Sequence, residues 1–106
     1  MLDMLNASRE AIKFVNGLTY EEFCENRMSQ FAVWKSLEIV GEAASRVNIQ
    51  TKETNAHIPW ADIVGMRKHL VHEYFRINLL RVWETVKRDI PILVSQLETL
   101  VPPDDE

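Results

Sequence analysis

The chain has 106 residues, 46% of them apolar and 26% charged, and it contains only three glycines and four prolines. This length predicts a single domain, and the scarcity of turn-forming residues favours helices. The net charge of −4 argues against a protein that coats nucleic acid without selection. A single cysteine, Cys24, excludes an internal disulfide and is expected to be a small hydrophobe, buried or half-buried.

Helical periodicity runs along nearly the whole chain, and no segment alternates between apolar and polar residues as a strand would. The first helix is expected from about residue 2 to residue 16, with Gly17 as its C-terminal cap. Thr19 and Glu22 form the pattern of a capping box, in which each side chain satisfies a backbone donor. A short second helix is therefore expected to begin at Thr19 and to end near Asn26.

The longest uninterrupted apolar pattern spans about residues 28–47 and predicts the central helix of the fold. Because apolar residues also lie outside its main stripe, this helix is expected to contact partners on two sides. Gly41, Ala43 and Ala44 would permit close approach of another helix, within the bundle or across a dimer interface. The main stripe consists of Phe31, Trp34, Leu37, Val40, Ala44 and Val47, and the apolar residues outside it are Ala32, Val33, Ile39 and Ala43.

The second half of the chain predicts three more helical segments. The polar stretch 48–57 is expected to be a connection, and Pro59 suits the first position of the helix that follows. Asn78 is a candidate cap for the next helix, which should break or restart at Pro91. A last helical piece is expected over residues 92–101.

These elements predict an all-α fold, an antiparallel bundle of four to five main helices that forms one domain over residues 1–101. The acidic tail 102–106 has no apolar anchor and is expected to be disordered. No apolar run approaches the roughly 20 residues that span a bilayer, and the first residues lack the pattern of a signal peptide. We therefore expect a cytoplasmic protein that does not enter the membrane.

Residues able to act on a phosphodiester concentrate in the helix expected after Pro59. Residues 60–90 carry a net charge of +2, against −2 for residues 1–59 and −4 for residues 91–106. Arg67 supplies a permanent phosphate ligand, and His72 can move protons near neutral pH. Together they are the minimum of a metal-free ribonuclease, and Lys68 and Arg76 are candidate contacts to RNA phosphates.

Helix geometry constrains how these residues could meet. In a straight α-helix Tyr74 lies within roughly 20° of Arg67, whereas His72 lies about 140° away from it. Arg67 and His72 converge only if the helix ends or distorts near Val71, if the arginine swings round, or if a partner subunit completes the site. We expect the first and the third of these together.

Other arrangements of the same residues carry less weight. His69 and His72 could share a metal, but only Glu73 is near as a third ligand and the spacing is not a zinc signature. The sequence therefore predicts no metal site and no cofactor. His57 is expected at the surface and Arg81 on a solvated helix face, whereas Trp34, Trp60 and Trp83 are expected in the core rather than as platforms for bases.

Several stretches resemble the HEPN superfamily of small helical proteins, and within it the HepT-like toxins. Arg67, His72 and Tyr74 match the HepT pattern of Arg, Asn, three residues, His, one residue and Tyr. Lys68 stands where that pattern has Asn, and Glu73 stands where Gly is frequent. The likeness covers about residues 2–100, and its other matching stretches are residues 30–33, 37–44, 58–60, 65–67, 82–83 and 89–91.

The resemblance implies a HEPN fold and a metal-independent endoribonuclease that acts as the toxin of a toxin–antitoxin pair. In such an enzyme His72 would be the general base or acid, and Arg67 would stabilise charge on the phosphoryl oxygens. The resemblance further implies a homodimer whose two motifs face one cleft, with an RNA substrate such as tRNA or mRNA. It implies a minimal nucleotidyltransferase as antitoxin, which transfers AMP to Tyr74. The alternative is a HEPN module without nuclease activity that only binds a nucleotidyltransferase, and Lys68 in place of Asn keeps that alternative open.

Overall fold

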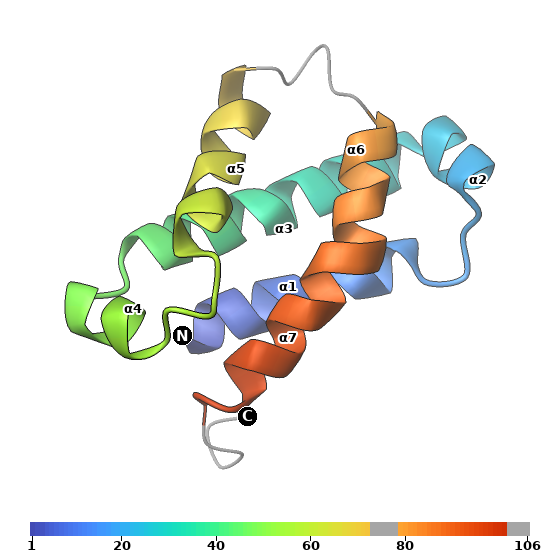
Figure 1. Cartoon of the computed structure of the whole chain (residues 1–106). Helices are drawn as coiled ribbons and strands as arrows, with labels where there is room; N and C mark the ends of the chain where they lie inside the picture. The colour runs from blue at the N-terminus through green and yellow to red at the C-terminus, as the bar shows by residue number, and fades with distance from the viewer. Residues whose placement is uncertain (73–78, 102–106) are drawn as a thin grey trace.

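The computed structural model describes the backbone of residues 1–72 and 79–101, and the side chains of residues 1–66 and 79–101. Every regular element in those ranges is a helix, which confirms the all-α prediction (Figure 1). Helix α1 (Leu2–Val15) runs antiparallel to the long helix α3 (Arg27–Ser45) and packs against it. Helix α5 (Trp60–His72) packs on α3 as well, and α7 (Ile90–Glu98) packs on α1. Helix α3 therefore occupies the centre of the bundle.

Local signals set the first helix boundaries as the sequence predicts. Gly17 follows α1 with a φ of +82°, a conformation that glycine adopts without steric cost. Thr19 Oγ1 accepts a hydrogen bond from the Glu22 amide at 3.1 Å, and Glu22 Oε1 accepts one from the Thr19 amide at 2.9 Å. This capping box begins α2 (Tyr20–Glu25), and the Asn26 side chain then caps α3.

The buried line of α3 differs from the predicted stripe. Val33, which the sequence placed outside the stripe, is fully buried, whereas Phe31 is 42% exposed. The buried residues recur at spacings of four, three and four because α1 and α5 cover two sides of α3 and leave a third side open. The predicted contact with partners on two sides is confirmed. The buried residues of α3 are Val33, Ser36, Leu37, Val40, Gly41 and Ala44.

The stretch 48–57 is not simply a connection, because it contains the short helix α4 (Ile49–Thr54). Asn48 Oδ1 accepts a hydrogen bond from the Thr51 amide at 2.8 Å and so caps this helix. None of the residues of α4 is buried. The helix therefore has no apolar stripe by which the sequence could reveal it.

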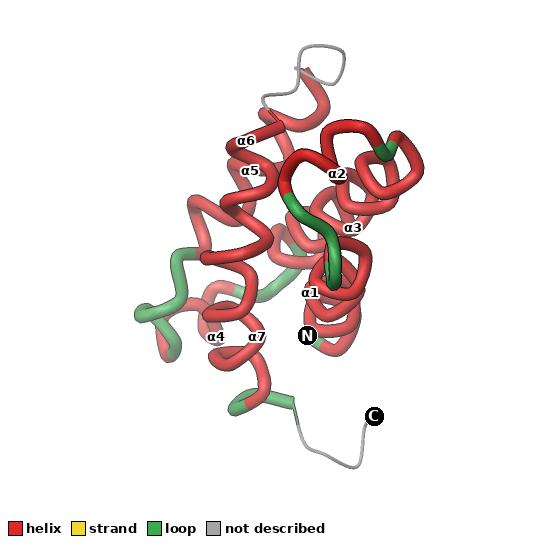
Figure 2. The backbone as a smooth tube through the Cα atoms, turned by 90° about the vertical axis from the view of Figure 1, so that its right-hand side faces the viewer, coloured by secondary structure: helices red, strands yellow, loops and turns green. Residues whose placement is uncertain are grey.

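The chain passes Pro91 without a break. Helix α6 (Leu79–Glu84) continues through a π-helix (Thr85–Asp89) directly into α7, and the three form one helical rod (Figure 2). The Ile90 amide donates to the Thr85 carbonyl five residues back, which widens the helix just before the proline. Pro91 then lies in the first turn of α7, where its missing N–H is not needed. The predicted cap Asn78 and the tail 102–106 lie outside the described residues.

The core lies between the α1–α3–α5 layer and the rod. Met4, Leu5, Phe23, Leu37 and Leu97 are among its largest fully buried side chains. The predicted core position of the tryptophans is confirmed: Trp60 is buried, and Trp34 and Trp83 are partly buried against the core. The prediction for Cys24 is wrong, because Phe23 takes the inward position of α2 and the thiol is exposed. Among the described residues no helix is both long and apolar enough to cross a membrane.

Candidate active site

The start of helix α5 is anchored to the bundle, and this helix carries the residues that the sequence predicts to be catalytic. Ile58 is buried, and the Trp60 indole donates a hydrogen bond to the Asn55 carbonyl at 3.1 Å. The Pro59 carbonyl accepts from the Ile63 amide at 3.1 Å, so Pro59 precedes the first residue of α5 rather than being that residue. These contacts fix the direction in which α5 leaves the bundle.

The first turns of α5 show which side of this helix faces the bundle. Trp60 and Ile63 are buried, and Val64 packs against the core while partly exposed. Ala61 and Asp62 are exposed. Helix α5 thus has a bundle side that contains Trp60 and Ile63 and a solvent side that contains Ala61.

Helical spacing shows on which of these two sides the predicted catalytic residues lie. The backbone of α5 is α-helical from Trp60 through His72, and the residues that follow lie outside the described part of the chain, so the expected helix end or distortion near Val71 stays a prediction. Arg67 follows Trp60 by seven residues, which places its backbone within about 20° of Trp60 on the bundle side. His72 follows Ala61 by eleven residues, which places its backbone within about 20° of Ala61 on the solvent side. The two predicted catalytic positions therefore lie on different sides of one regular helix.

The remaining predicted site residues divide between the described and undescribed parts of the chain. Lys68 lies on α5, where the structure describes the backbone only. Tyr74 and Arg76 lie outside the described residues, so their roles stay predictions. His57, expected at the surface, is exposed in the loop before α5, and Arg81 is exposed on α6. These two positions are confirmed.

The rod beside the candidate site carries a mixture of charges. The last described turn of α5 and the first turn of α6 lie at the same end of the molecule (Figure 1). Within the rod, Lys87 Nζ lies 4.9 Å above the Trp83 ring, and Arg88 forms ion pairs with Glu84 at 3.8 Å and Asp89 at 3.3 Å. Lys87 and Arg88 thus have partners within the rod itself.

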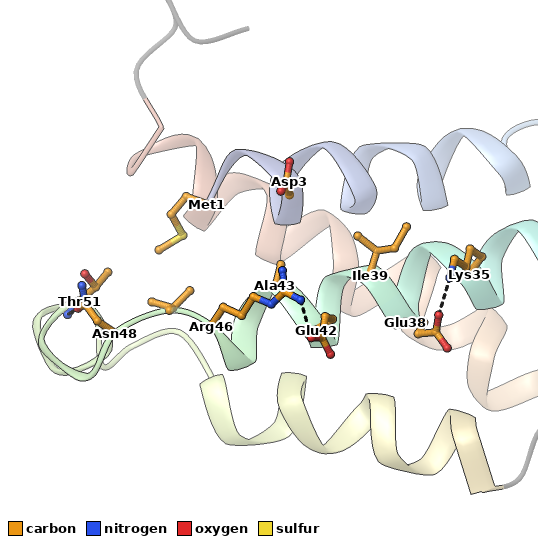
Figure 3. Close-up of a pocket in the computed structure, with 11 residues that line it drawn as sticks. Met1, Asp3, Lys35, Glu38, Ile39, Glu42, Ala43, Arg46, Asn48 and Thr51 are labelled. Atoms are coloured by element: carbon orange, nitrogen blue, oxygen red, sulfur yellow. Dashed lines mark hydrogen bonds and ion pairs between the residues drawn. The ribbon is translucent and has the colours of Figure 1, made fainter.

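The described part of the chain brings together no group of three or more His, Cys, Asp or Glu residues that could hold a metal ion. A groove of about 520 Å³ lies along the outer face of α3 (Figure 3). Lys35, Ile39 and Glu42 line this groove together with residues of α1 and α4. This groove was not predicted from the sequence, although the spacing of polar and apolar residues on α3 was its available signal.

Comparison with known proteins identifies similar chains over almost the whole length. The model of the family described as ribonuclease HepT-like matches residues 4–100. A protein of Methanocaldococcus jannaschii to which an RNase function is attributed is 36% identical over 98 residues, which are 92% of this chain and 90% of that protein. A protein of Thermococcus cleftensis to which the name ribonuclease HepT is attributed is 37% identical over 102 residues, 92% of this chain and 93% of that protein.

A third similar protein, from Caldanaerobacter subterraneus, also has an RNase function attributed to it. It is 37% identical over 90 residues, which are 85% of this chain and 80% of that protein. No solved structure gives a significant match to the chain. The matched regions include both α3 and the segment that contains Arg67, His72 and Tyr74.

Proposed function

The chain belongs to the HepT-like ribonuclease family, and from this premise we propose that it is an endoribonuclease toxin whose catalytic residues are Arg67 and His72. The observation that carries the proposal is the family match over residues 4–100, which contains Arg, His and Tyr in the order and spacing of the HepT pattern. The proposed substrate is RNA in the cytoplasm, and the proposed assembly is a homodimer.

The proposed reaction needs no metal, because His72 transfers protons and Arg67 stabilises negative charge. One histidine removes the proton of an RNA 2′-hydroxyl, whose oxygen then attacks the adjacent phosphorus. Arg67 stabilises the negative charge that develops on the non-bridging oxygens. A proton is delivered to the departing 5′-oxygen, so the products are a 2′,3′-cyclic phosphate and a 5′-hydroxyl. A second histidine, from the other subunit, would serve the opposite proton transfer.

Two departures from the HepT pattern bear on the rate. Lys68 can bind a phosphate but cannot accept the hydrogen bonds that an asparagine accepts. Glu73 adds a negative charge one residue after His72. We expect these two residues to affect how fast RNA is cut rather than which bond is cut.

The test of the nuclease is to induce the chain alone in bacteria and to incubate the purified protein with RNA in EDTA. We expect growth arrest and fragments that end in a cyclic phosphate. Arg67→Ala and His72→Ala should each abolish both effects. His57→Ala, which changes an exposed histidine outside α5, should abolish neither. Unchanged growth and intact RNA would favour the alternative, a HEPN module that only binds a nucleotidyltransferase.

The proposed antitoxin is a minimal nucleotidyltransferase that transfers AMP to the Tyr74 hydroxyl. The added phosphate would place negative charge beside Arg67 and compete with the RNA phosphate for the same guanidinium. Intact mass after co-expression of the two proteins should rise in units of AMP. The increment should vanish in Tyr74→Phe and persist in Tyr20→Phe, the matched change at the chain's other tyrosine. A mass that does not change, or that rises equally in Tyr74→Phe, contradicts this regulation.

A further inference from the structure

An exposed arginine lies over an exposed aromatic ring at the start of α3. Arg27 Cζ is 5.3 Å from the centre of the Phe31 ring, and the two residues are one helical turn apart. Phe31 is 42% exposed, although its side chain is large and apolar, and Arg27 is exposed as well. We call this pair the Arg27–Phe31 platform.

Hydrogen bonds fix the backbone that carries the platform. Asn26 Oδ1 accepts a hydrogen bond from the Ser29 amide at 2.9 Å and so sets the first turn of α3. The Gln30 side-chain amide donates to the Phe23 carbonyl at 2.9 Å and to the Cys24 carbonyl at 3.0 Å. Because Phe23 is fully buried, these bonds tie the start of α3 to the core. A surface that is fixed in this way loses little conformational freedom when a ligand binds to it.

The Arg27 guanidinium differs in its partner from two other arginines of the bundle. Within the described part of the chain no carboxylate pairs with Arg27, whereas Arg46 pairs with Glu42 at 3.1 Å and Arg88 pairs with Glu84 at 3.8 Å. The planar group of Arg27 lies over a ring instead. A guanidinium held in this position can stack a second flat, electron-rich group on its outer face. A nucleobase is such a group.

The platform lies on the side of α3 that faces α5. Glu38 points from α3 toward α5 (Figure 3). Phe31 precedes Glu38 by seven residues and Arg27 precedes it by eleven, so both lie within about 20° of Glu38 around the helix. Helix α5 packs on α3 and runs toward the start of α3 as it approaches His72 (Figure 3). The platform and the predicted catalytic part of α5 therefore lie toward the same end of the molecule.

We propose that the Arg27–Phe31 platform is a subsite for the RNA substrate, which holds one unpaired nucleotide by stacking its base on the Arg27 guanidinium. This inference rests on the proposed function, because it takes the substrate to be RNA and names where the strand lies beside α5. A base within a duplex has both faces covered by its neighbours, so the subsite takes single-stranded RNA. Every base has a flat face, so the subsite selects for an unpaired base rather than for a sequence.

The first test measures the binding of a short single-stranded RNA to the His72→Ala chain, which does not consume the RNA. Arg27→Lys keeps the charge but removes the plane, and it should raise the dissociation constant about fivefold. Phe31→Leu should weaken binding as well, because the guanidinium loses the ring that orients it. The matched controls are Arg88→Lys on the rod and Phe14→Leu at a 40% exposed position of α1, and neither should change the dissociation constant.

Arg27→Lys also separates stacking from a simple phosphate contact. A lysine attracts a phosphate as an arginine does, but it has no planar group on which a base could stack. Undiminished binding by Arg27→Lys therefore overturns the proposal. Circular dichroism of each variant shows whether the helical bundle is intact.

The second test locates the stacked base. The same RNA is prepared with a single abasic nucleotide at each position in turn. One position should weaken binding to the Arg27 chain about fivefold and should cause no further loss in Arg27→Lys. The absence of such a position, or an equal loss in both chains, overturns the stacking.

Cleavage of the unmodified RNA is recorded separately with His72 in place. Arg27→Lys should raise KM more than it lowers kcat, because the platform binds the strand and takes no part in the proton transfers. Stacking without any cleavage refutes the proposed nuclease alone. Cleavage with the same KM in Arg27→Lys refutes this inference alone.

Discussion

Tyr20 and Cys24 lie one helical turn apart on α2, with the Cys24 thiol exposed. Hydrogen bonding to Cys24 raises the pKa of the Tyr20 phenol above its ordinary value of 10.0, and burial of the ring adds to the effect. Electrostatic repulsion from Cys24, Glu21 and Glu84 raises this pKa further. Tyr20 also packs on Trp83, with ring centroids 6.0 Å apart.

The first prediction concerns alkaline pH. Replacing Cys24 with alanine should lower the pKa of Tyr20 toward 10, as followed by tyrosinate absorbance in a Tyr74→Phe background that leaves Tyr20 as the only tyrosine. Because the folded-state pKa is raised, the unfolded chain loses its phenolic proton first, and stability should fall as pH rises from 10 through the raised value. Cys24→Ala should reduce that fall. An identical titration with and without the thiol contradicts this account.

The second prediction concerns the start of α2. Thr19→Ala removes the acceptor for the Glu22 amide and should lower the free energy of unfolding by roughly 1 kcal/mol. Thr54→Ala is the matched control, because its exposed hydroxyl bonds only the Gln50 carbonyl within α4. Urea denaturation measures both variants. Equal losses would show that the cap does not stabilise the fold.

The third prediction concerns the centre of the bundle. Leu37 is fully buried in α3, so Leu37→Ala should cost about 2–5 kcal/mol through lost burial and the cavity left behind. Leu80→Ala makes the same change at a 46% exposed position of α6 and should cost far less. Thermal or urea unfolding distinguishes the two. A loss at Leu37 as small as that at Leu80 would contradict the placement of α3 at the centre.

The fourth prediction concerns the RNA contacts proposed for Lys68 and Arg76. If each neutralises one phosphate of a single strand, each alanine variant should reduce the slope of log binding constant against log salt by roughly 0.7. Binding is measured with the inactive His72→Ala chain, so that the RNA is not consumed. Lys13→Ala, a charge loss at an exposed position of α1, should leave the slope unchanged. Equal slopes for all variants would exclude Lys68 and Arg76 from the RNA surface.

Local chemistry in the sequence was sufficient to predict the helix boundaries that depend on it. The glycine after α1 and the capping box before α2 act over a few residues, so the sequence alone locates them. The exposure of Phe31 and Cys24 was not predictable in this way, because it depends on which sides of α3 and α2 their neighbours cover. Helix α4 was not predicted, because it buries no residue and therefore shows no apolar stripe in the sequence.

The candidate site was predictable in its residues rather than in its arrangement. Arg67 and His72 stand out by residue type and by resemblance, and their backbone positions on α5 follow from the helical spacing. The spacing of polar and apolar residues on α3 signals an outer side, but the groove there was not predictable, because a helix that is apolar on several sides does not reveal which of those sides a neighbour covers. Only the positions of α1 and α5 decide that.

Because α5 is a regular helix through His72, its Arg67 and His72 lie on different sides. This bears on the activity of two inactive variants when they are co-expressed. If each site takes its arginine from one chain and its first histidine from the other, a chain with Arg67→Ala and a chain with His72→Ala form a mixed dimer in which one site keeps Arg67 and one His72 but lacks the second histidine. Co-expression of these two inactive variants should then restore part of the RNA cleavage, at a rate below that of the wild type, although either variant alone has none. Alleles that fail to complement would place both residues of a site in the same chain.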